Sequence, residues 1–332
     1  MKAKRPTRTD VALKAGVAPS TVTLILGNKG DDLRIPATTQ DRVREAARSL
    51  GYYPNRLIQS VMRGRSGILG LYLRHDQYEK ASGYWPTLVV CLMQAAAQEG
   101  VQLLVHCGTV DTPTEEVFAR QAGGMVDGAM IVNSGNDPVV GRIIEAGLPA
   151  VEVGDPYSQL PFVGVDGVQG IRLAMEHFAA IGRRNPALVS YVTHYVANAR
   201  ARVAEFERCA TEMFAVPEPQ TRIIEAETAE EAFPRLMELD PKPDSLLCTS
   251  DELVYSLITI FERNGIAVPG EIAMIGFDCL EALGSNRIAT SVATPMREMA
   301  RLAIQKLIRI VEDQPIEHDT LLAVSLRVGD TA

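Results

Sequence analysis

Three hydroxyl side chains, Ser20, Thr21 and Thr23, lie on one side of a short segment near the start of the chain, PSTVTLIL. In the same segment Val22 and Ile25 recur at the spacing of a buried helical face, so the hydroxyls fall on the opposite face. Short hydroxyl groups form hydrogen bonds with base edges and with phosphate oxygens. The pattern therefore favours contact with a nucleic acid, although serine and threonine near a helix start are also common caps.

Two further segments are predicted to position these hydroxyls. Thr9 is expected to cap a helix that runs to about Ala15, and Gly16 permits the left-handed turn that ends it. A longer helix is expected to begin at Pro36 and to end at Gly51. Its apolar stripe consists of Val43, Ala46, Ala47 and Leu50. Together the three segments predict a helix-turn-helix whose second helix enters the major groove, but three-helix bundles without a DNA-binding role share the pattern.

The distribution of charge favours the DNA-binding alternative. Residues 1–66 carry 13 Lys+Arg against 5 Asp+Glu, whereas the remaining 266 residues carry 20 against 36, and the whole chain of 332 residues has a net charge of −8. A small basic segment on a large acidic remainder is typical of a domain that contacts a polyanion.

The motif DVALKAGVAPSTVTLIL, followed by RVREAARSLGYYPNR, resembles the N-terminal part of the LacI/GalR family of bacterial transcription regulators. The resemblance implies a DNA-binding head, a hinge and an effector-binding body. It implies base contacts for Pro19 and Ser20, and phosphate or base contacts for Thr21 and Thr23. The full set of expected DNA-binding residues is Thr9, Pro19, Ser20, Thr21, Thr23, Leu24, Asn28, Asn55, Arg56 and Val61.

The chain departs from the family pattern at the expected DNA surface. Leu24 stands where many members have an arginine that contacts guanine, and Ala18 replaces the usual serine cap. Pro19 has no side-chain donor and can offer only an apolar contact, for instance to a thymine methyl group. We therefore expect an operator that differs from the common one of the family.

The stretch NRLIQSVMRGRSG follows, and it is too short to form a stable helix alone in water. The resemblance implies a hinge helix that folds on DNA and wedges Val61 into the minor groove. A flexible basic linker is the alternative, and both descriptions hold if the segment folds only when bound.

From Ile68 onward, apolar runs alternate with amphipathic segments, which predicts an α/β body with parallel sheets. The number of runs is too large for one sheet, so the predicted fold is an all-α head plus a periplasmic-binding-protein-like body of two doubly wound subdomains. The helix MREMARLAIQKLIRIVED and a single strand TLLAVSLRV are expected to cross between the subdomains. The predicted boundaries are 1–54 for the head, 55–66 for the hinge, about 67–164 plus 293–319 for the first subdomain, and about 165–292 plus 320–332 for the second.

Ligands of open α/β sheets bind beyond the carboxyl ends of the strands, so polar residues at those ends are candidates for an effector site. The family resemblance narrows them to Tyr84, Trp85, Asn133, Arg202, Glu227, Ser250 and Asp278. An Arg202–Asp278 pair would suit a polar ligand, and a plain salt bridge between strands is the alternative. Glu227 stands near the usual place of an aromatic ring, which favours a strongly polar or cationic effector.

Other functions lack the residues that they require. No GxGxxG, Walker A or HExxH motif occurs, and the five histidines and five cysteines are dispersed, so we expect neither an enzyme nor a cofactor or metal site. A solute-binding protein would need a signal peptide, and no apolar leader or membrane-length run is present. An α/β enzyme that modifies sugars or nucleotides remains a second alternative.

We therefore predict a cytoplasmic, homodimeric repressor that binds double-stranded DNA at a palindromic operator and responds to a small polar metabolite. Dimerisation is expected because a single helix-turn-helix has little specificity and two-fold symmetry matches a palindrome. The apolar segment with Val89, Val90, Leu92 and Met93 could lie at the dimer interface. No leucine heptads follow Arg327, so a tetramer is not expected.

Overall fold

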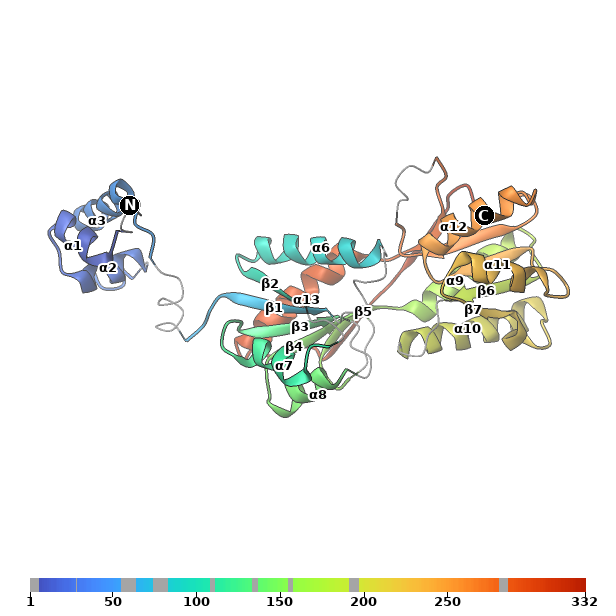
Figure 1. The fold of residues 1–332 in the computed structure, drawn as a ribbon, viewed down its shortest axis with the longest axis horizontal. Coiled ribbons are helices and arrows are strands. Elements are labelled where there is room, and N and C mark those ends of the chain that lie inside the picture. Colours follow the sequence, from blue (N-terminus) through green and yellow to red (C-terminus); the bar gives the residue numbers. More distant parts are fainter. Residues whose placement is uncertain are drawn as a thin grey trace. The chain divides into compact units, whose positions relative to one another are not determined.

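The computed structural model describes residues 6–27, 29–54, 64–73, 83–107, 111–132, 137–154, 158–190, 197–280 and 286–332. Their contacts divide the chain into two compact units, Met1–Gly67 and Ile68–Ala332. We call the first unit the head and the second the body, and each is described by itself (Figure 1).

The head consists of three helices, α1 (Arg8–Ala15), α2 (Pro19–Leu26) and α3 (Ala37–Leu50), and each packs against the other two. Their buried side chains form one small core of Val11, Ala12, Ala15, Val22, Ile25, Val43, Ala46 and Ala47. The apolar faces predicted for the second and third helices are thus confirmed. Among the described helices none is alone long and apolar enough to cross a membrane, and α1 and α2 reach that limit only together, across a bend of 101°.

The ends of the head helices agree with the sequence at both glycines but not at the first cap. Gly16 and Gly51 both have a φ of 65°, the left-handed conformation that ends a helix. The cap of α1 is Thr7, not Thr9, which lies inside the helix. Thr7 accepts a hydrogen bond from the amide of Asp10, and the Asp10 carboxylate accepts one from the amide of Thr7. This reciprocal arrangement needs an acidic residue three positions after the cap, which Thr9 lacks.

The first sheet of the body has the strand order β11-β5-β4-β3-β1-β2 and is parallel throughout. Its strands are β1 (Ile68–Leu73), β2 (Gln102–Cys107), β3 (Gly128–Val132), β4 (Ala150–Val153), β5 (Phe162–Val165) and β11 (Asp319–Leu322). Its helices are α6 (Tyr84–Gln98) and α13 (Met296–Val311), which pack together, and α7 (Thr114–Ala122) and α8 (Pro138–Glu145), which form a second pair. Two separate clusters of buried side chains lie under these pairs, so the central strands are apolar on both faces.

The second sheet has the strand order β12-β10-β9-β8-β6-β7, and only β12 runs antiparallel to its neighbour. Its strands are β6 (Pro186–Ser190), β7 (Ile223–Glu225), β8 (Ser245–Cys248), β9 (Ala273–Phe277), β10 (Thr290–Ala293) and β12 (Ser325–Arg327). Helices α9 (Gly167–Ala180) and α10 (Ala197–Phe214) pack together, as do α11 (Ala229–Met237) and α12 (Asp251–Arg263), and a short 3₁₀ turn spans Pro219–Arg222. The two sheets with their helices are the first and second subdomains, in agreement with the predicted fold class.

The chain passes between the subdomains after β5, after β10 and after β11. The expectation of one strand over TLLAVSLRV is wrong, because β11 pairs with β5 in the first sheet whereas β12 pairs with β10 in the second. The last passage therefore lies at residues 323–324 rather than at 319–320. Helix α13 contacts β3, β4 and β5, so it belongs to the first subdomain and does not itself cross.

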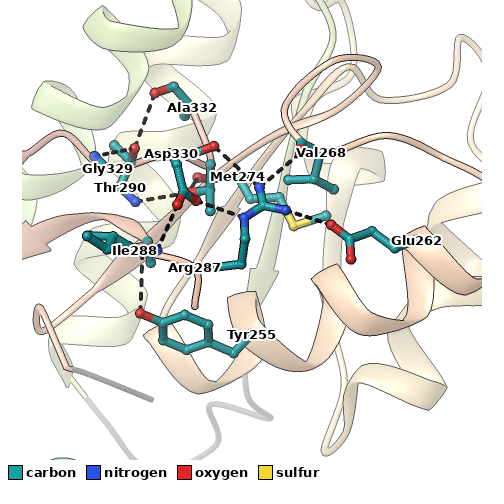
Figure 2. Close-up of polar contacts among 12 residues, drawn as sticks. Tyr255, Glu262, Val268, Met274, Arg287, Ile288, Thr290, Gly329, Asp330 and Ala332 are labelled. Atoms are coloured by element: carbon teal, nitrogen blue, oxygen red, sulfur yellow. Dashed lines mark hydrogen bonds and ion pairs between the residues drawn. The ribbon is translucent and has the colours of Figure 1, made fainter. Parts of the chain in front are cut away.

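The last residues of the chain form hydrogen bonds with the second subdomain around Arg287 (Figure 2). The Arg287 guanidinium donates to Glu262 at 2.6 Å, to Asp330 at 2.9 Å and to the carbonyl of Val268 at 2.9 Å. Thr331 is fully buried, and its hydroxyl donates to the carbonyl of Met274 at 2.7 Å. The segment after β12 is thus an integral part of this subdomain.

Candidate DNA interface and effector site

The outer face of α2 presents the side chains predicted to contact DNA. Val22 and Ile25 point into the head core, whereas Ser20 is exposed and Thr21 and Leu24 are half-buried. Pro19, also exposed, occupies the first helical position, and the preceding Ala18 provides no side-chain cap. Pro19 has no amide hydrogen, and the amides of Thr21 and Val22 donate to the carbonyl of Ala18, so the exposed hydroxyl of Ser20 is the polar group that this helix start offers to solvent.

The hydroxyl of Thr23, in contrast, forms hydrogen bonds within the head. It accepts a hydrogen bond from the Arg8 guanidinium at 3.1 Å and donates one to the carbonyl of Pro19 at 3.2 Å. Arg8 is the first residue of α1 and is exposed, so its cationic group lies against the side of α2.

Part of the positive charge of the head is neutralised on α3. Arg44 lies 3.7 Å from Asp41, and Arg48 lies 3.4 Å from Glu45. Both pairs are largely exposed, so each contributes little to stability. The predicted contacts Asn28, Asn55, Arg56 and Val61, and most of the hinge with them, lie outside the described residues.

In the second subdomain the end of β9 has an unusual backbone. Asp278 has a φ of 91° and Cys279 a φ of 60°, a region that residues other than glycine rarely adopt. Three hydrogen bonds hold them there: the amide of Asp278 donates to the carbonyl of Val292, that of Cys279 to the Ser291 hydroxyl, and that of Leu280 to the Asp251 carboxylate. Strained backbone that its surroundings fix in this way is concentrated at binding sites.

The side chains around this turn are polar and preorganised. Thr294 donates to the Asp278 carboxylate at 3.2 Å. The guanidinium carbon of Arg202 lies 3.9 Å from the centre of the Phe277 ring, a cation–π contact. The Arg202 Nε atom is buried and has no hydrogen-bond partner among the described residues. Arg202 contacts the ring of Phe277, and Asp278 directly follows Phe277 in the chain. Both residues therefore lie at the end of β9.

The start of α12 lies beside the same turn. Ser250 is buried and caps the helix, with its hydroxyl accepting from the amide of Leu253 at 3.3 Å. Glu252 accepts a hydrogen bond from the amide of Gly83, which precedes α6 in the first subdomain. Tyr84 and Trp85 follow Gly83 directly, with ring centres 4.6 Å apart and ring planes at 86°. The structure therefore brings Tyr84 and Trp85 towards Ser250 and the β9 turn.

Two other predicted effector residues are not part of this group. Glu227 is exposed after β7, and β6 and β8 separate that edge strand from β9. Asn133 lies outside the described residues. Over the described parts of the chain, no group of three or more His, Cys, Asp or Glu side chains could hold a metal ion.

Glu205 joins two helices of the second subdomain. It is buried between Arg208, at 2.6 Å, and Arg172 of α9, at 3.0 Å. The hydrogen bond from Arg208, together with that from Arg172, outweighs burial and lowers the pKa of Glu205 to about 2. The residue thus joins α9 to α10 as a carboxylate.

Phe277 and Thr294 were not anticipated from the sequence. Phe277 is part of a buried apolar run, which predicts only a core side chain, and Thr294 follows an ordinary strand. Nothing in their local patterns indicates that one lies under a cation and the other beside a carboxylate.

The buried Asp251 predicts a specific pH dependence of stability. Burial raises its pKa to about 6, although hydrogen bonds from Ser291 and Leu280 and the charge of Arg327 act in the opposite direction. Because the folded protein holds this proton more tightly than the unfolded chain, the contribution is present at pH 4 and is lost as the pH rises through 6. The free energy of unfolding, relative to that of Asp251→Asn, should fall by about 2 kcal/mol between pH 4 and 7.

Urea unfolding of both full-length proteins over this pH range tests the prediction. Asparagine matches aspartate in size and stays neutral, so the titration of Glu205 and of all other groups cancels in the difference. Parallel pH profiles for the two proteins would show that Asp251 does not titrate in this window.

The chain combines a small helical head, whose second helix has a polar outer face, with a body of two largely parallel sheets and a preorganised polar strand end. These features define a DNA-binding regulator of the ligand-responsive kind. The comparisons with known proteins agree. Residues 7–55 match the model of the bacterial regulatory proteins of the lacI family, and residues 175–332 match that of a periplasmic binding protein-like domain.

Relatives and solved structures extend the match over nearly the whole chain. The HTH-type transcriptional regulator CelR of Thermobifida fusca is 26% identical over 317 residues, which cover 92% of each chain. The maltose regulon regulatory protein MalI of Escherichia coli is 28% identical over 345 residues, which cover 98% of each. The lac repressor dimer bound to operator and an anti-inducer has the same fold, with a TM-score of 0.84 at 22% identity and 99% of both chains covered.

Residues 7–55 form a DNA-binding head of the lacI family of bacterial regulatory proteins, and the chain is a DNA-binding transcription regulator. The family resemblance deduced from the sequence is confirmed, and the relatives are named as regulators rather than enzymes.

Proposed function

We propose that the protein is a homodimeric repressor that binds a palindromic operator and changes its affinity when a small polyhydroxylated metabolite binds the body. The strongest support is the turn after β9, where Asp278 and Cys279 are held at positive φ beside Arg202. Asp278 is itself a residue of this strained turn, and Arg202 lies over the ring of the preceding Phe277, so a carboxylate and a guanidinium are fixed at one strand end. We place this regulator in the cytoplasm, because its target is chromosomal DNA.

The chemistry of the strand end favours a neutral, hydroxyl-rich effector. Asp278 accepts hydrogen bonds from hydroxyls, Arg202 donates to oxygen atoms, and Trp85 offers an apolar ring surface. Relatives include a regulator solved in complex with cellobiose and a sucrose operon repressor. A cationic effector, expected from Glu227, loses support because β6 and β8 separate that residue from the β9 turn.

Helix α6 supports the dimer. Leu88 and Leu92 are fully buried against the sheet, and Val89 is partly buried, whereas Val90 is 50% and Met93 54% exposed. An apolar pair left exposed on a helix suits a contact with a second copy of the chain. Two heads related by two-fold symmetry would then contact the two halves of a palindrome.

Effector binding is proposed to act by shifting the population of body conformations that permit the two heads to engage together. A coupling of about 1–3 kcal/mol changes operator occupancy by about 5–150-fold, so no large rearrangement is required. The predicted hinge over 55–66 would transmit the change, with Val61 as the minor-groove wedge.

Selection of DNA from a randomised duplex library by the full-length protein tests this function. We expect a palindromic site whose binding weakens steeply with salt, and cellobiose, maltose or sucrose should change the affinity for it by about 5–150-fold. A sugar acid and a polyamine serve as charged controls. Selection of no sequence would reject the DNA-binding proposal, and a response to the charged controls alone would reject the neutral effector.

A further inference from the structure

The outer face of α2 lacks a group that can distinguish guanine from the other bases. Ser20 and Thr21 have hydroxyls, which bond to several bases alike, and Pro19 and Leu24 are apolar. Guanine is recognised in the major groove by a cation that donates two hydrogen bonds to its O6 and N7 atoms, most often an arginine. No residue of α2 is a lysine or an arginine.

Arg8 supplies such a group from the neighbouring helix. Its guanidinium lies 3.1 Å from the hydroxyl of Thr23, which α2 carries between Thr21 and Leu24. A guanidinium has five N–H donors in a rigid fork, and the bond to Thr23 uses one of them. The side chain of Arg8 is exposed, so the fork is available to a ligand that approaches α2 from solution.

The position of Arg8 is fixed at both ends of its side chain. At the backbone, Thr7 and Asp10 form the reciprocal cap of α1, and Arg8 lies directly after that cap. At the tip, Thr23 is itself anchored, because its hydroxyl donates to the carbonyl of Pro19 one turn earlier. A side chain ordered before binding loses less entropy when it forms a specific contact.

Helix stability does not explain an arginine at this place. The first turn of a helix is its positive dipole end, where a cation is unfavourable and an acidic residue such as Asp10 is favourable. The exposed Arg8 also contributes nothing to the head core.

We propose that Arg8 contacts a guanine in each half of the operator, and that Thr23 is the positioning residue that directs it. Thr23 is then not a direct DNA contact, because its hydroxyl already forms hydrogen bonds with Arg8 and with the carbonyl of Pro19. The proposal rests on the proposed function and adds the residue that sets the base preference.

The experiment compares sites that full-length variants select from a randomised duplex library, with affinities measured by gel shift. The wild-type site should contain a guanine at one symmetric position of each half. The site selected by Arg8→Ala should lose its base preference at that position alone. Replacing that guanine in one half of the site should weaken binding of the wild-type protein by about 5–150-fold and leave binding of Arg8→Ala unchanged. Arg48→Ala removes the same side chain from α3 and should keep the wild-type preference.

Variants of Thr23 test the positioning role. Thr23→Val keeps the shape of the side chain but removes the hydroxyl, so it should weaken the guanine preference. Thr23→Ser keeps the hydroxyl and should therefore retain that preference. Arg8→Lys keeps the charge without the planar fork, so it should retain the salt dependence and lose part of the discrimination. Circular dichroism confirms that each head is folded before its site is determined.

The outcomes are distinguishable. If Arg8→Ala selects the wild-type site and weakens binding to all duplexes alike, with a smaller salt dependence, Arg8 contacts phosphate and the proposal is overturned. Equal preferences for Thr23→Val and Thr23→Ser would overturn the role of Thr23. If the wild type selects no sequence at all, the proposed function fails, and the inference fails with it.

Discussion

Replacing Val22 with aspartate is expected to unfold the head and to weaken operator binding by about 100-fold or more, while the body stays folded. Val22 is fully buried at the centre of the eight-residue head core. An unpaired carboxylate there costs about 3–5 kcal/mol, which is comparable to the whole stability of a domain of this size. Because head and body are separate compact units, the loss should not spread. Gel shift measures the binding, and calorimetry measures the two thermal transitions.

Leu13 provides the matched control. It belongs to the neighbouring helix α1 and is 80% exposed, so Leu13→Asp introduces the same charge without burying it. This variant should keep a folded head with thermal transitions close to those of the wild type. A Val22→Asp protein that retains the head transition would show that the three helices do not share one core. Loss of the body transition in the same variant would show that the two units fold together.

The sequence predicts the head well because its signals are local. The stripe of Val43, Ala46 and Ala47 and the glycine at position 51 are consecutive features of one helix, and each has one physical interpretation. The error at Thr9 has the same origin. Both threonines can cap a helix, and only the acidic residue three positions later distinguishes Thr7 from Thr9.

The body shows where local signals fail. The sequence predicts one strand over residues 320–328, and most of this segment lies in β11 or β12, but the pattern does not say which strand lies beside each part. That choice depends on partners distant in the chain, since β11 pairs with β5 and β12 with β10. The pattern is continuous across Ala323 and Val324, so the exchange of sheets between them leaves no local trace.

The sequence likewise predicts only part of the candidate effector site. Asp278 is identifiable because it follows a buried strand, and parallel sheets bind ligands at that end. Its positive φ and the contact of Arg202 with the Phe277 ring depend on packing between α10 and β9, elements that are far apart in sequence. The sequence therefore indicates which residues are candidates, and the fold decides which of them meet.

Replacing Lys306 with alanine is expected to destabilise the body by about 3–5 kcal/mol. Lys306 belongs to α13 and is only 7% exposed. Its ammonium donates to the carbonyls of Phe162 and His318, at 2.8 and 3.0 Å, and to the hydroxyl of Thr320 at 2.8 Å. Burial lowers the pKa of Lys306, and these three acceptors replace the water that the charge has lost. Alanine would remove this donor from the carbonyl of Phe162 and the hydroxyl of Thr320 and leave a cavity, whereas the carbonyl of His318 would keep its bond from the amide of Phe162.

Urea unfolding of the full-length protein measures this effect, with Arg309→Ala as the control. Arg309 lies on the same helix and is exposed, so its removal should change stability by less than about 0.5 kcal/mol. Lys306→Met keeps most of the side-chain volume and should fall between the two, because it loses the hydrogen bonds without creating the cavity. If Lys306→Ala unfolds like Arg309→Ala, the ammonium does not hold β11 against β5. In that case the last passage of the chain between the two subdomains, which begins directly after β11, would depend on backbone pairing alone.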